Sequence, residues 1–129
     1  MDAFRLFLHV LAASIWVGGQ IVLAALVPAL RNYGAEATRA AARAFNRIAW
    51  PAFAVAVVTG LWNVFALPLD DLRHPWIELK VLAVLLSGVG AAVHQFAKGN
   101  TAMLAVGGAM SSVFAVAAMY LGFLVTWVP

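Results

Sequence analysis

The stretch LHVLAASIWVGG, residues 8–19, places a histidine inside a run of residues that is otherwise as apolar as lipid. His9 is followed after seven residues by Trp16 and after four more by Gln20, and these spacings put the three side chains on one helical face. Imidazole can ligate a metal or exchange a proton, so His9 is a candidate ligand for copper or for haem iron. The alternative is a buried histidine that is hydrogen-bonded to a main-chain carbonyl.

A second polar face is formed by Lys80, Ser87 and His94, which are seven residues apart. An ionised lysine in hydrocarbon costs at least about 2.5–3.5 kcal/mol, so Lys80 should face other helices or extend to the interface as an anchor. Facing inward, its ammonium is a candidate to bind an anionic group of a cofactor. His94 lies about 21 Å further along the same helix, where it is either a second cofactor-binding residue or an interfacial histidine bonded to water or backbone.

The rest of the chain supplies helices that can hold these residues in a membrane. It has 129 residues, of which 65% are hydrophobic and 10% are charged, whereas soluble domains are about one quarter charged. Residues 6–30, 48–69, 81–97 and 99–129 carry no charge, and about 20 apolar residues suffice to span the hydrocarbon core. We therefore predict one all-α transmembrane domain over residues 1–129, with helices at about 3–30, 39–67, 76–96 and 101–127. Short connections favour an up-down-up-down four-helix bundle.

The basic residues predict how this bundle is oriented. Those around the first and third loops are Arg31, Arg39, Arg43, Arg47 and Lys98, whereas the opposite side carries Arg5 and Arg73. By the positive-inside rule, we expect a multi-pass protein of the plasma membrane with both termini on the outer side. The net charge of +3 comes from basic residues that cluster at the membrane boundary. The expected partner is therefore the lipid bilayer and not nucleic acid. The absence of cysteine excludes disulfides and thiolate ligands.

The depths of the polar residues predict two zones. His9 and Lys80 each lie about 6 Å inside the outer boundary, on parallel helices, so we expect them to converge on the bundle axis. Met119 of the fourth helix comes to a similar level and is a candidate soft ligand for a metal beside His9. The inner zone holds His94 with Arg47, whose guanidinium could pair with an anionic cofactor group.

Three segments carry a resemblance to a known family: LHVLAASIWVGG, RAFNRIAWPAFAVAVVTGLWN and WIELKVLAVLLSGVGAAVHQF. Together they resemble the CopD family of membrane proteins, which is named for copper resistance. The resemblance implies copper handling or transport through a polar intramembrane pocket. Members of that family commonly have about eight helices, so it also implies that a second copy of this chain completes a pathway, as a homo-oligomer.

The chain is also similar, more distantly, to HemJ-type four-helix proteins that bind haem b through a histidine. His9 and Lys80 occupy the places of the first-helix histidine and the third-helix lysine on which those proteins depend. This similarity implies a haem b redox protein acting on a porphyrinogen or a quinone.

Three functions therefore stay open, and whether the chain is an enzyme stays open with them: copper handling, haem-dependent redox chemistry, and a noncatalytic subunit that packs in a larger assembly. An ammonium repels a free cation and is not a metal ligand until it loses a proton. The pairing of His9 with Lys80 therefore favours either haem with a propionate near Lys80, or copper on His9 with Lys80 pointing outward.

Overall fold

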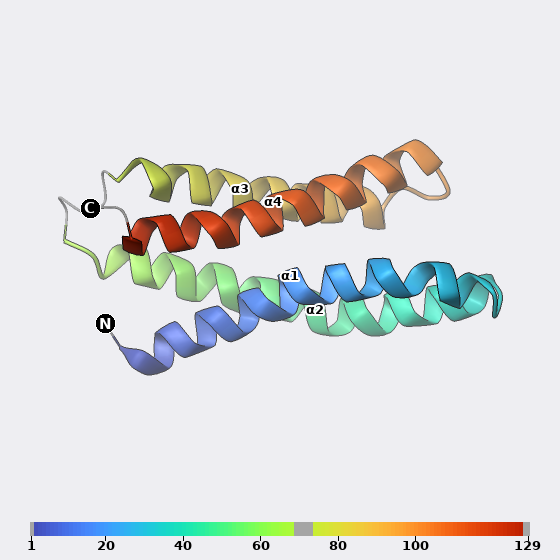
Figure 1. The fold of residues 1–129 in the computed structure, drawn as a ribbon, viewed down its shortest axis with the longest axis horizontal. Coiled ribbons are helices and arrows are strands. Elements are labelled where there is room, and N and C mark those ends of the chain that lie inside the picture. Colours follow the sequence, from blue (N-terminus) through green and yellow to red (C-terminus); the bar gives the residue numbers. More distant parts are fainter. Residues whose placement is uncertain (1, 69–73, 128–129) are drawn as a thin grey trace. The chain divides into compact units, whose positions relative to one another are not determined.

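The computed structural model describes residues 2–68 and 74–127, and within these ranges it is built from four α-helices without a β-strand (Figure 1). The helices are α1 (Ala3–Arg31), α2 (Ala35–Phe65), α3 (Pro75–Gln95) and α4 (Thr101–Trp127). The predicted all-α fold with four helices is confirmed. Arg73, which entered the prediction of orientation, lies outside the described residues.

The helix ends follow from local sequence. Asp2 caps α1 by accepting a hydrogen bond from the backbone N–H of Phe4 at 3.1 Å. α2 begins one turn earlier than expected, because Gly34, with φ of 97°, reverses the chain directly after α1. α3 begins at Pro75, a residue suited to a first helical turn, and the Asn100 side chain accepts from the backbone N–H of Met103 in the first turn of α4.

All four helices are long and apolar enough to cross a membrane: they contain 29, 31, 21 and 27 residues. The chain is therefore a multi-pass membrane protein. Large side chains such as Phe7, Val58, Leu85 and Phe123 are more than half exposed, which suits contact with lipid.

The chain divides into two compact units, Met1–Ala66 and Leu67–Pro129. Each unit is a helical hairpin in which two helices run side by side in opposite directions, α1 with α2 and α3 with α4 (Figure 1).

The first hairpin is held by aromatic packing around Trp16, whose exposed fraction is 5%. The ring of Trp16 lies 4.5 Å from that of Phe53 and 5.5 Å from that of Trp50, centroid to centroid. These are favourable separations for aromatic pairs. The face that Trp16 shares with His9 is therefore turned toward α2.

The second hairpin is held by small residues. A Cβ atom at Gly90 would lie 2.6 Å from the backbone nitrogen of Ser111, and one at Gly107 would lie 2.5 Å from the backbone nitrogen of His94. Ser87, with 1% exposure, donates a hydrogen bond to the carbonyl oxygen of Ser111 at 2.8 Å. Close backbone approach at small residues thus occurs between α3 and α4.

Candidate functional site

His9 of α1 contacts α2 near the end of the first hairpin at which α1 begins. Its Nδ1 atom lies 2.9 Å from the carbonyl oxygen of Ala56 and 3.1 Å from Oγ1 of Thr59. Thr59 is 5% exposed, and the His9 side chain is half-buried. The histidine is thus held against the neighbouring helix by its Nδ1 edge.

These contacts determine the tautomer of His9. The Thr59 hydroxyl lies 2.6 Å from the carbonyl oxygen of Val55, one turn earlier in α2, and donates its proton there. Both neighbours of Nδ1 are then acceptors, so Nδ1 carries the proton and the neutral ring has its lone pair on Nε2. A histidine that ligates a metal usually donates its other ring N–H to a carbonyl or carboxylate in this way.

Gly60 provides the space for this ring. A Cβ atom at Gly60 would lie 3.0 Å from Cε1 of His9 and 3.5 Å from Nδ1. The imidazole therefore rests directly on the backbone of α2. Any side chain at this position would press on the ring edge that lies between its two nitrogens.

One turn before His9, Arg5 forms a second polar contact between the same helices. Its Nε donates to Oδ1 of Asn63 at 2.6 Å, and its guanidinium carbon lies 5.3 Å from the centre of the Trp62 ring. Residues four apart on a helix are neighbours, so His9 and Arg5 adjoin. Asn63 and Trp62 of α2 therefore lie beside Arg5, one turn from the level of His9.

In the second hairpin, Lys80 extends over α4. A Cβ atom at Gly122 would lie 2.9 Å from Nζ of Lys80 and 3.5 Å from its Cε, so the side chain lies against the surface that this glycine leaves open. Lys80 is half-buried. This contact places the Lys80 ammonium beside α4, and both predicted orientations of Lys80 stay predictions. Met119 is half-buried on the same helix as Gly122.

His94 repeats the arrangement of His9 near the other end of the second hairpin. Its Nδ1 lies 2.7 Å from the carbonyl oxygen of Leu104, and a Cβ atom at Gly108 would lie 3.0 Å from Nδ1. A carbonyl can only accept, so Nδ1 carries the proton here as well. His94 is exposed, and its backbone bond is the alternative that the sequence left open for an interfacial histidine.

The predicted site residues are divided between the hairpins. His9 and Arg47 belong to the first hairpin. His9 contacts α2 at Ala56, which lies nine residues, or about 13 Å, from Arg47 along that helix. Lys80, His94 and Met119 belong to the second. The convergence of His9 with Lys80 or Met119, and of His94 with Arg47, joins the two units and stays a prediction.

Comparison with known proteins found no match to a family model, to a curated protein or to a solved structure. Within residues 2–68 and 74–127, no group of three or more His, Asp or Glu side chains gathers in a geometry that could hold a metal ion.

Proposed function

We propose that the chain is a CopD-like, copper-handling protein of the plasma membrane, in which His9 binds the ion transiently through Nε2. The observation that supports this most directly is the Nδ1 hydrogen bond of His9 to the Ala56 carbonyl, which orients the ring and places the lone pair of its neutral form on Nε2. Imidazole and thioether groups are suitable ligands for copper, and transport requires an affinity low enough for release.

The experiment compares copper binding and copper flux in three proteins. Purified wild-type chain, His9→Gln and His94→Gln are titrated with Cu(I) against a chromophoric chelator, and each is reconstituted into vesicles for flux measurement. His94→Gln is a matched control, because it removes a histidine with the same Nδ1-to-carbonyl bond from the other hairpin. We expect His9→Gln to abolish binding and flux and His94→Gln to retain both. Equal flux in His9→Gln and wild-type vesicles would refute the proposal.

Haem b is the second candidate, and the position of Arg5 favours it. Arg5 adjoins His9 and its guanidinium is held by Asn63 and Trp62, which suits an anionic propionate and disfavours a free cation. Haem would supply the redox chemistry, while His9 would hold it through its imidazole and Arg5 would supply a cation for the propionate. Chain purified from haem-supplemented cells should then show a Soret band that His9→Gln removes. Folded, haem-supplemented protein without that absorbance would exclude this candidate.

The proposal includes an arrangement of the two hairpins. We propose one up-down-up-down bundle with both termini outside, in which Lys80 faces His9, Arg47 lies near His94, and Met119 lies at the level of His9. A second copy of the chain would complete the pathway. Oxidative cross-linking between cysteines placed at positions 9 and 80 tests the central pair. If both His9→Gln and Lys80→Ala left copper content, haem content and stability unchanged, a noncatalytic assembly subunit would replace both candidates.

A further inference from the structure

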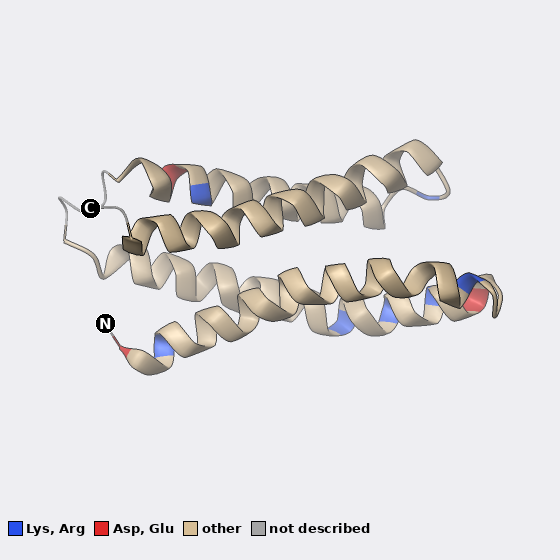
Figure 2. Cartoon of the chain, viewed as in Figure 1, with Lys and Arg blue, Asp and Glu red and all other residues tan. Residues whose placement is uncertain are grey.

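Three arginines follow one another along the first part of α2. Arg39, Arg43 and Arg47 are each separated by four residues and are exposed, so they form a continuous stripe on one helical face. Figure 2 shows these basic positions along α2 toward the end at which it joins α1. The side chains of Arg39 and Arg43 are 70% and 58% exposed. We call Arg39, Arg43 and Arg47 the arginine stripe.

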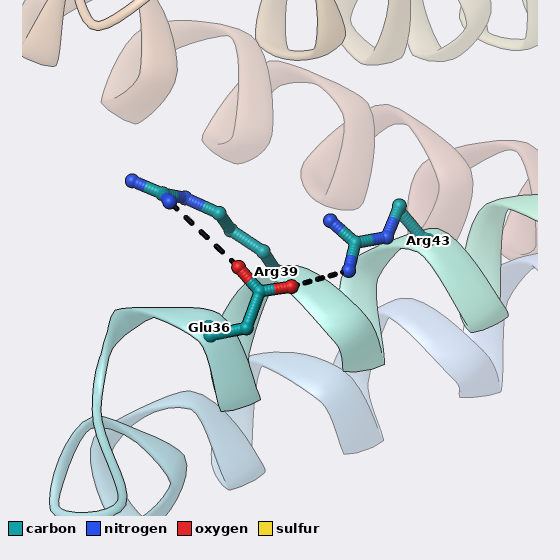
Figure 3. A network of polar contacts seen from close by, with 3 residues as sticks. All are labelled: Glu36, Arg39 and Arg43. Atoms are coloured by element: carbon teal, nitrogen blue, oxygen red, sulfur yellow. Dashed lines mark hydrogen bonds and ion pairs between the residues drawn. The ribbon is translucent and has the colours of Figure 1, made fainter.

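A single carboxylate draws two of these guanidiniums together. Glu36 places Oε1 2.6 Å from Nη2 of Arg43 and Oε2 3.8 Å from Nη1 of Arg39 (Figure 3). Two guanidiniums thus converge on one anion through two of its oxygens. A phosphate group offers oxygens to guanidiniums in the same manner, so this part of the stripe has the geometry to receive one.

The position of the stripe along α2 corresponds to the membrane boundary. The contact of Arg5 with Asn63 and Trp62 marks the outer end of this hairpin, because a charged and an indole group both prefer the interface. A hydrocarbon core of about 30 Å covers about 20 helical residues, which reaches from Asn63 to about position 43. Arg43 therefore lies at the inner boundary, with Arg39 one turn outside it and Arg47 one turn inside it.

The same face of α2 continues as a surface suited to lipid. Ala54 and Val58 follow Arg47 by seven and eleven residues, which keeps them on its helical face, and both are exposed, Val58 by 62%. Ala49 and Thr59 are buried toward α1. A guanidinium on a lipid-facing surface at this depth extends to the headgroups, where the available anions are lipid phosphates.

We propose that the arginine stripe binds the headgroup phosphate of an anionic phospholipid, with Glu36 competing for Arg39 and Arg43. The chain carries eight Lys and Arg residues against five Asp and Glu, and Glu36 is the acidic residue beside the stripe. Binding a phosphate would neutralise the charge that Glu36 leaves uncompensated. This inference is independent of any metal or haem at His9.

The test uses the full chain in neutral detergent, titrated with dioctanoylphosphatidylglycerol, dioctanoylphosphatidylcholine or inorganic phosphate and followed by native mass spectrometry. We expect phosphatidylglycerol to bind more tightly than phosphatidylcholine. Arg43→Gln and Arg47→Gln should each weaken phosphatidylglycerol binding about fivefold, the effect of one basic side chain near an anionic surface. Glu36→Gln should strengthen it. Lys98→Gln, which removes a basic charge from the other hairpin, should change it less than twofold.

Three outcomes would contradict the proposal, each in a different way. If Lys98→Gln weakened binding as much as Arg43→Gln, the attraction would come from net charge and not from the stripe. Inorganic phosphate binding as tightly as phosphatidylglycerol would assign the stripe to a soluble anion. Weaker lipid binding by Glu36→Gln would also overturn the proposal. Because Glu36→Gln is expected to gain affinity, a folding defect in the arginine variants cannot imitate the expected set of results.

Discussion

Gly90→Ala should separate α3 from α4. The new Cβ would lie 2.6 Å from the backbone nitrogen of Ser111 and 2.9 Å from the carbonyl oxygen of Gly107, and ordinary contact begins at 3.4 Å. Both neighbours are backbone atoms of α4, so a side-chain rotation cannot relieve the overlap and the helices must move apart by roughly 0.8 Å. That movement also strains the hydrogen bond from Ser87 to Ser111. We expect a loss of about 1–3 kcal/mol in the free energy of unfolding.

The matched control is Gly18→Ala in α1, where a Cβ atom meets nothing within 4 Å. Replacing a helical glycine by alanine changes helix stability favourably by about 0.5–1 kcal/mol, so this control should be neutral or slightly stabilising. Both variants are unfolded by titration with sodium dodecyl sulfate and followed by circular dichroism and tryptophan fluorescence. Equal unfolding midpoints for Gly90→Ala and Gly18→Ala would refute the close packing of α3 on α4.

Three further substitutions test the contacts at His9 and at the buried Ser87. Gly60→Ala presses on the His9 ring. If His9 binds copper or haem, the affinity for that ligand should fall about 10–100-fold, as when a residue that orients a metal ligand is lost. Unchanged affinity in the same chelator titration would contradict the orienting role. Thr59→Val removes one acceptor but leaves the Ala56 carbonyl to hold the ring, so affinity should fall by less than about tenfold, and a larger loss than for Gly60→Ala would reverse the order of importance. Ser87→Ala should lower the free energy of unfolding by about 0.6 kcal/mol, measured by detergent titration, because one interhelical hydrogen bond is lost.

The four helices were predictable because each charge-free stretch is long enough to span a bilayer. The start of α2 was not found, because residues 35–38 include Glu36 and Thr38 and lack the apolar character used to place spans. They are helical because Gly34 ends the preceding turn and because Glu36 pairs with Arg39 and Arg43 one and two turns ahead. Local charge pairing thus extended the helix beyond its apolar part.

The chemistry of His9 was only partly predictable. Its spacing from Trp16 indicated a face turned toward another helix, and Trp16 is indeed packed on α2. The residues that hold the imidazole, Thr59 and Gly60, were not found, because their contact with His9 depends on the register between α1 and α2. A threonine beside a glycine inside an apolar span is the signal that could have suggested them, since such a pair offers an acceptor next to an open backbone.

The two hairpins hold a histidine by the same pair of contacts, and these contacts connect helix packing to any ligand chemistry of the imidazole. In each hairpin, Nδ1 donates to a main-chain carbonyl of the adjacent helix while the ring rests on a glycine of that helix, Gly60 under His9 and Gly108 under His94. In the neutral ring, this bond places the proton on Nδ1 and the lone pair on Nε2, which is the arrangement of a metal-ligating histidine. Because the carbonyl and the glycine belong to the partner helix, a change of register within a hairpin would move the ring and its ligand atom together. Gly60 and Gly108 therefore leave the space in which each imidazole reaches the carbonyl that determines which nitrogen is offered to a ligand.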